Sequence, residues 1–144
     1  MIENDTIKLL RECDAGVKMG IDSIEEVFSR VESRQLKQLL SDCRDEHEKL
    51  DKEITAALDR FHDEGKKPNP MAKGMAHIKT EVKIMVEESD ATIADLMTDG
   101  CNMGVKSLSR YLNEYAAASE AAKDIAKRLI KSEADLAESI REYL

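Results

Sequence analysis

The most regular hydrophobic pattern in the chain runs from Ser33 to Phe61. Apolar residues recur there in alternating steps of four and three, which is the spacing of one narrow stripe along an α-helix. One position in the rhythm is polar, and it is occupied by His47. The apolar members are Leu36, Leu40, Cys43, Leu50, Ile54, Ala57 and Phe61. This stretch predicts a bundle helix whose core-facing seam is interrupted by an imidazole.

Three more stretches carry stripes of the same kind. The spacing predicts one helix over about 5–31, another over about 89–115 and a last one from about Ser119 onward. The stripe of the first predicted helix contains one acid, Asp14, and the stripe of the last contains one acid, Glu133. Polar side chains are therefore expected at several places along the core.

The segment between the second and third long helices contains a clear break and then a shorter stripe. Residues 62–70 read HDEGKKPNP and hold both prolines of the chain. The stripe that follows is Met71, Met75, Ile78, Val82 and Met85. It predicts a helix over about 71–88 that is roughly 27 Å long, comparable to the bundle itself. We expect this helix to carry the chain back along the bundle, with its methionines on the outside or against a second subunit.

Composition narrows the fold to one all-α domain spanning residues 1–144. Charged residues make up 36 % of the chain, aromatic residues only 3 %, and prolines number two. Such a chain lacks the aromatic residues of a β-sandwich or barrel core. The predicted fold is a four-helix bundle of two antiparallel hairpins, about 5–61 and about 89–144, joined by the crossover helix.

The two halves of the chain also repeat one another. The segment GVKMGIDSI at 16–24 matches GCNMGVKSL at 100–108, at an offset of 84. An offset of 86 places His47 on Glu133 in the second helices of the two halves. The repeat predicts a pseudo-twofold bundle, and its glycines are expected to allow close approach of helices.

Duplicated hairpins with a crossover resemble the ferritin-like superfamily, rubrerythrins included, over nearly the whole chain. The resemblance implies a di-iron centre in the core. In that family a Glu on the first helix is followed, at a characteristic spacing, by the Glu of a Glu-x-x-His motif on the second. Here Asp14 and His47 stand at that spacing, 33 apart, and Leu50 occupies the position of the motif's His.

The second half departs from the family pattern in a similar way. Glu133 keeps the Glu position, but Leu136 replaces the His. The same spacing before Glu133 falls on Gly100, next to Asp99. A standard di-iron centre needs about four carboxylates and two imidazoles. We therefore expect this centre, with its ferroxidase or peroxidase chemistry, to be lost. The chain is most similar to uncharacterised bacterial domain families that share the bundle without the full ligand set.

Two interpretations of the polar core remain open. In the first, His47 is protonated and, together with Arg44, pairs with Asp14 and Glu133 in a structural network that fixes helix register. In the second, Cys43 and His47, four apart on one helical face, join Asp14 and Glu133 to hold a mononuclear Zn²⁺ or Fe²⁺. No cofactor is expected under the first interpretation.

The sequence offers no support for other chemistry. It contains no Ser-His-acid arrangement, phosphate-binding glycine loop or CxxC motif. An enzymatic activity is therefore not expected, and a structural or protein-binding role is. A small-molecule pocket between the helices would leave the same pattern.

Charge and cysteine content shape the expected partners and location. Net charge is −8, with basic residues scattered among acids, which argues against nucleic acid. Residues 1–8 carry acids and no apolar run, so neither a signal peptide nor a membrane span is predicted. Three cysteines without a pairing pattern favour a reducing, cytoplasmic location. We expect a homo-oligomer, such as a dimer, or an unknown protein partner.

Overall fold

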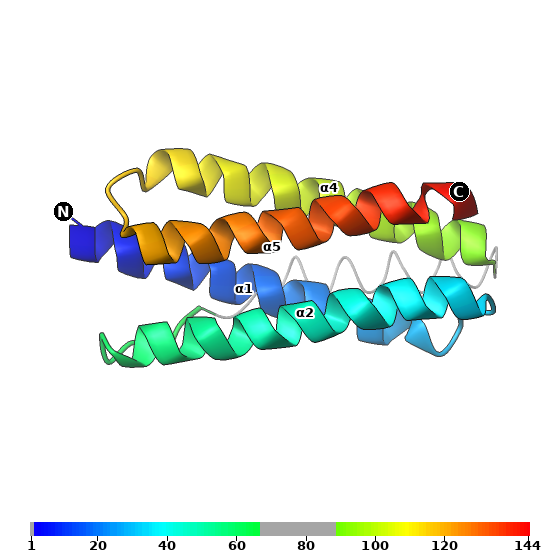
Figure 1. Ribbon diagram of the computed structural model, residues 1–144, viewed down its shortest axis with the longest axis horizontal. Helices are drawn as coiled ribbons and strands as arrows, with labels where there is room; N and C mark the ends of the chain where they lie inside the picture. Colours follow the sequence, from blue (N-terminus) through cyan, green and yellow to red (C-terminus); the bar gives the residue numbers. More distant parts are fainter. Residues whose placement is uncertain (1, 67–88) are drawn as a thin grey trace.

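The computed structural model describes residues 2–66 and 89–144, which fold as long helices side by side (Figure 1). Within these residues the elements are α1 (Ile2–Phe28), α2 (Arg34–Asp59), α4 (Asp90–Glu114), α5 (Glu120–Ser139) and a short 3₁₀ helix, η1 (Ile140–Tyr143). The described part of the chain contains no β-strand. The all-α prediction is confirmed. The predicted crossover helix over about 71–88, with its methionine stripe, lies outside the described residues.

Three of the four long helices in the described part of the chain begin at serine caps, close to the starts that the sequence predicts. The side chains of Ser33, Ser89 and Ser119 each accept a hydrogen bond from the backbone N–H three residues further on. Such a bond satisfies one of the N–H groups that a helix start leaves unpaired. The caps therefore set where α2, α4 and α5 start.

The helix ends differ from the predictions by a few residues. α1 starts at Ile2 rather than about residue 5 and ends at Phe28, although Val31 stays buried in the turn that follows. α2 ends at Asp59, and Leu58 rather than Ala57 is buried in its last turn. Helix ends are set by packing of the flanking turns, which periodicity does not report.

The helices pair as the short connections require. α1 packs against α2, and α4 packs against α5, each pair antiparallel (Figure 1). The two turns, at 29–33 and 115–119, lie at opposite ends of the bundle in the same view. Further contacts of α2 with α5 and of α1 with α4 and α5 close the four helices around one core.

A carboxylate at the start of α4 holds the turn between α1 and α2. Both oxygens of Asp90 accept a hydrogen bond, from the N–H groups of Glu32 and Ser33, at 2.9 Å each. A matching contact occurs at the other end, where Thr6 Oγ1 accepts from the N–H of Ser119 at 2.8 Å. Thr6 and Asp90 are related by the offset of 84, and Ser33 and Ser119 by the offset of 86, so these contacts follow the sequence repeat.

The buried apolar residues form two clusters, one toward each end of the bundle. The first contains Leu9, Leu10, Cys13, Val17, Leu50, Ile54, Leu58, Leu108, Ala118, Ala122, Ile125, Ala126 and Leu129. The second contains Ile24, Val27, Val31, Leu36, Leu40, Cys43, Ile93, Met97, Cys101, Leu136 and Ile140. Along every helix the boundary between the two clusters falls at the same level.

One residue from each helix occupies this boundary: Gly20, His47, Gly104 and Glu133, which we call the polar layer. His47 is 1 % exposed and Glu133 is 7 % exposed. The polar position that the sequence predicts at His47 is therefore part of a layer across the bundle. In this layer two glycines face two ionisable side chains.

Among the described helices, none is both long enough and apolar enough to cross a membrane.

Candidate functional site: the polar layer and the groove beside it

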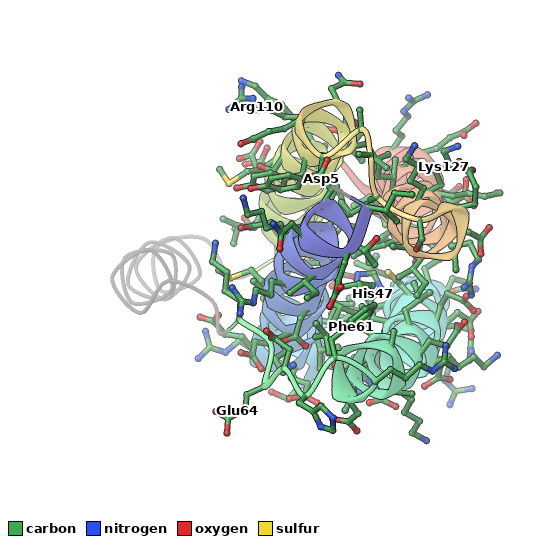
Figure 2. All side chains as sticks on the ribbon, turned by 90° about the vertical axis from the view of Figure 1, so that its left-hand side faces the viewer. Asp5, His47, Phe61, Glu64, Arg110 and Lys127 are labelled. Carbon is green, nitrogen blue, oxygen red and sulfur yellow. The ribbon has the colours of Figure 1, made fainter. Side chains whose placement is uncertain are left out.

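The imidazole of His47 is held on both sides. Nδ1 lies 3.0 Å from the carbonyl oxygen of Cys43, one helical turn earlier, to which it donates. Nε2 then points to Glu133 on α5, with 3.5 Å between Nε2 and Oε1. Seen along the bundle, His47 lies inside the ring of helices (Figure 2). A ring whose Nδ1 donates to a carbonyl can face a carboxylate favourably only if Nε2 also carries a proton.

Burial and polar contacts have opposite effects on the charge state of His47. Burial lowers its pKa, but the contacts with Cys43 and the Glu133 carboxylate outweigh burial and raise the pKa to about 10. His47 is therefore an imidazolium at neutral pH and forms a buried ion pair with Glu133. The 3.5 Å separation is longer than a charge-assisted hydrogen bond of about 2.8 Å.

The glycines of the polar layer make room for these two side chains. A Cβ at Gly20 would come 2.7 Å from Cδ2 and Nε2 of His47. A Cβ at Gly104 would overlap the carboxylate of Glu133. By contrast, a Cβ at Gly100 would meet nothing within 4 Å. The repeated glycines were predicted to allow close helix approach, but two of them instead admit a polar side chain from a neighbouring helix.

The Glu133 carboxylate is only partly satisfied. Oε1 faces His47, while Oε2 is buried and has no hydrogen-bond partner among the described residues. An unpaired buried oxygen of this kind is costly, roughly 1–3 kcal/mol. Gly104 leaves space for this oxygen. Because glycine has no side chain, Gly104 donates no side-chain hydrogen bond to it.

Asp14 is buried, as its place on the seam predicts, but it belongs to a different cluster. Its Oδ1 is paired with Lys18, and its Oδ2 accepts the backbone N–H of Lys66 at 3.0 Å. Position 14 lies six residues from Gly20, about 9 Å along α1. The structure therefore places Asp14 outside the network that was predicted to join it to His47 and Glu133.

Asp14 instead fastens the chain after α2 to α1. Gly65 lies next to the Asp14 carboxylate and has a φ of +85°, a conformation that glycine adopts readily. A Cβ at position 65 would overlap that carboxylate. Arg11 and Asp63 form a bidentate ion pair beside it, with the Nη2–Oδ2 pair at 2.5 Å. Arg44, predicted to pair with the core acids, instead has its guanidinium 4.7 Å from the centre of the Phe28 ring.

The side chains do not fit a metal centre of the kind that the resemblance implies. Leu50 and Leu136, at the two imidazole positions, are buried in the apolar clusters. Within residues 2–66 and 89–144, no group of three or more His, Cys, Asp or Glu side chains is placed to hold a metal ion. Cys43, His47 and Glu133 are brought together, while Asp14 is not.

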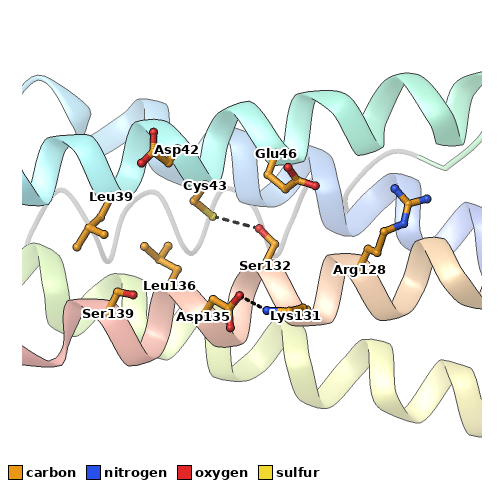
Figure 3. A pocket seen from close by; sticks show the side chains of 10 residues that line it. All are labelled: Leu39, Asp42, Cys43, Glu46, Arg128, Lys131, Ser132, Asp135, Leu136 and Ser139. Atoms are coloured by element: carbon orange, nitrogen blue, oxygen red, sulfur yellow. Dashed lines mark hydrogen bonds and ion pairs between the residues drawn. The ribbon is translucent and has the colours of Figure 1, made fainter.

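A groove of about 500 Å³ runs along the surface between α2 and α5, next to the polar layer (Figure 3). Cys43 and Glu46 line it from α2, and Arg128, Ser132 and Asp135 line it from α5. The Ser132 hydroxyl lies 3.7 Å from Cys43 Sγ and 3.4 Å from His47 Nδ1. The groove thus reaches the edge of the buried pair.

Ser132 is the member of this site that sequence reasoning missed. It stands one position before Glu133, outside the apolar stripe of α5, and its pattern resembles that of any surface serine. Only the crossing of α2 and α5 places its hydroxyl against a thiol 89 residues earlier. No signal in one sequence reports that crossing.

Comparison of the chain with protein-family models, with curated proteins and with solved structures finds no match.

Proposed function

We propose that this chain is a ferritin-like bundle without a di-iron centre, and that its role is structural or protein-binding rather than catalytic. The supporting observation is the polar layer, in which the imidazolium of His47 and the carboxylate of Glu133 balance each other's charge inside the bundle. Asp14, the third buried charged side chain among the described residues, has its own cation in Lys18. The core charges are thus compensated by the chain's own side chains.

Such a pair suits a role in specifying the fold. Replacing a buried ion pair by apolar residues is often neutral or stabilising, so pairs of this kind are retained for reasons other than stability. Here each charged side chain occupies a space left by a glycine on the helix beside it. We propose that this matching of charge and space keeps the four helices in one register.

The test is the metal content of protein purified without chelator or affinity tag, with His47→Ala measured in parallel. We expect sub-stoichiometric metal that does not change in the variant. Near-stoichiometric Fe, Zn or Mn that disappears in His47→Ala would instead support the alternative, a metalloprotein with a mononuclear site. That result would contradict the proposal directly, because the variant removes only one imidazole.

Self-association is the interaction we expect for this bundle. The predicted contact surface includes the methionine stripe of residues 71–85, outside the described residues, so the dimer stays a prediction. Size-exclusion chromatography with light scattering would measure it. A mass twice that of the single chain supports self-association, and a monomer at all concentrations would direct the proposal to a different protein partner.

A further inference from the structure

We infer that Cys43 is a reactive thiol, and that the α2–α5 groove admits to it a small uncharged two-electron oxidant of the hydroperoxide class. The inference is independent of the proposed function. It is carried by four side chains from two helices. Cys43 on α2 and Ser132 on α5 line the groove, and His47 on α2 and Glu133 on α5 are buried behind them.

The sulfur of Cys43 has two hydrogen-bonding neighbours. His47 Nδ1 lies 3.6 Å from Sγ, and Ser132 Oγ lies 3.7 Å from it. A protonated imidazole and a hydroxyl beside a sulfur both stabilise the thiolate, which is the nucleophilic form. Glu133, 3.5 Å from the far side of the ring, keeps the positive charge on the imidazole. Glu133, His47 and Cys43 therefore lie in sequence, and Cys43 is the thiol that lines the groove.

The other two cysteines have no comparable surroundings. Cys13 and Cys101 are buried, and burial, together with neighbouring acids, raises the pKa of each to about 12. Neither lines the groove. All three thiols are free of disulfides, so Cys13 and Cys101 serve as internal controls for the reactivity of Cys43.

The surroundings of Cys43 also select the reagent. The residue is only 8 % exposed, so a small reagent reaches the sulfur more readily than a bulky one. Three acids (Asp42, Glu46 and Asp135) and two bases (Arg128 and Lys131) line the same groove, so its lining has no strong excess of either charge to attract a charged reagent. A small neutral peroxide meets both conditions.

The reaction is a two-electron oxidation of sulfur. The Cys43 thiolate attacks one peroxide oxygen, an S–O bond forms, and the O–O bond breaks with its electron pair on the leaving hydroxide or alkoxide. Solvent protonates that leaving group, and Cys43 becomes a sulfenic acid. Two molecules of a small thiol from solution then return it to the thiol, giving one disulfide and one water.

The test uses the intact protein and hydrogen peroxide, with dimedone to trap sulfenic acid and mass spectrometry to locate it. We expect Cys43 to be trapped about ten-fold faster than Cys13 or Cys101. His47→Gln should slow labelling of Cys43 about ten-fold, and Ser132→Ala should slow it a few-fold. Ser139→Ala, which alters the same groove away from the cluster, is the matched control and should change nothing.

A second readout separates activation from simple access. The rate of Cys43 alkylation by iodoacetamide is measured against pH, and its half-maximum should move to higher pH in His47→Gln. Labelling of Cys43 no faster than that of the other thiols, or an unchanged pH profile in His47→Gln, would overturn the inference. If circular dichroism shows that His47→Gln is unfolded, Ser132→Ala decides, and an unchanged rate in that variant overturns it too.

Discussion

His47 and Glu133 show how much a single buried pair depends on its surroundings. Each would be unfavourable alone in an apolar core, and each lies where a glycine of the neighbouring helix leaves space. The sequence predicts that both are on seams, because the heptad-like rhythm reaches them. It does not predict that they meet each other, or that Asp14, on an equally regular seam, pairs with Lys18 instead.

The raised pKa of His47 predicts a loss of stability at alkaline pH. The folded value of about 10 exceeds the unfolded value of about 6.5, so the stabilisation is complete below pH 6.5 and declines as pH rises toward 10. The free energy of unfolding should fall by about 3 kcal/mol between pH 6.5 and pH 9. Urea titrations at several pH values measure it. Cys13 and Cys101 add a decline of the same sign only above about pH 9.

The control for this prediction is His47→Gln, which should lack the decline between pH 6.5 and pH 9. NMR of the wild-type imidazole gives an independent reading. A His47 ring that titrates between pH 6 and pH 7 would show that the imidazole is not charged by its contacts with Cys43 and Glu133.

Gly100 and Gly104 stand one helical turn apart on α4 and offer a matched pair. Gly104→Ala should lower the free energy of unfolding by roughly 1–3 kcal/mol, because the added Cβ overlaps the Glu133 carboxylate. Gly100→Ala should raise it by about 0.5–1 kcal/mol, because the methyl meets open space and alanine favours the helix. In a Glu133→Ala background the loss from Gly104→Ala should shrink. Equal effects of the two substitutions would contradict the role given to Gly104.

At the scale of the element, the helix starts are the most predictable feature. Serine caps fix the first residue of α2, α4 and α5 through a local hydrogen bond, which depends on residues three apart. The turns are fixed differently, by side chains from the other half of the chain. Asp90 binds the α1–α2 turn, and Asp5 and Thr6 bind the α4–α5 turn. The contact of Asp90 with residues 57 and 58 positions earlier is not foreseeable from the sequence.

Asp90→Ala should therefore loosen a turn that is distant in the sequence. The substitution removes the acceptor for the Glu32 and Ser33 amides, and we expect a loss of about 1–3 kcal/mol in unfolding free energy. Asp99→Ala, an exposed acid on the same helix, is the control and should stay within about 0.5 kcal/mol. Hydrogen exchange of the Glu32 and Ser33 amides measures directly whether this contact protects them. Unchanged exchange rates in Asp90→Ala would show that the carboxylate does not hold the turn.

At the scale of the whole molecule, the polar layer divides one bundle core into two apolar clusters. Each helix contributes one residue to the layer, and these residues follow the internal repeat, glycine against glycine and His47 against Glu133. A shift of one helix by a turn would move a charged side chain into an apolar cluster. The layer therefore penalises alternative registers more than it stabilises the native one.

Replacing the whole pair tests that view. Single His47→Leu should lower the unfolding free energy by about 3–5 kcal/mol, because it leaves the Glu133 carboxylate buried without a cation. The double variant His47→Leu/Glu133→Leu should recover most or all of that loss, since two apolar side chains replace the pair. Chemical denaturation of the wild-type protein, the single variant and the double variant measures both changes in unfolding free energy. A double variant as unstable as the single one would show that the pair is not self-compensating.

The sequence by itself determined the all-α class, the approximate starts of three helices and the burial of Asp14, His47 and Glu133, because these depend on periodicity and on contacts a few residues apart. Only the tertiary structure decided which buried groups meet. Helix periodicity states which face of a helix is buried, but the axial position of one helix against another comes from packing of all four. That axial position sets His47 opposite Glu133, fits both beside glycines, leaves Asp14 with Lys18 and brings Ser132 to Cys43.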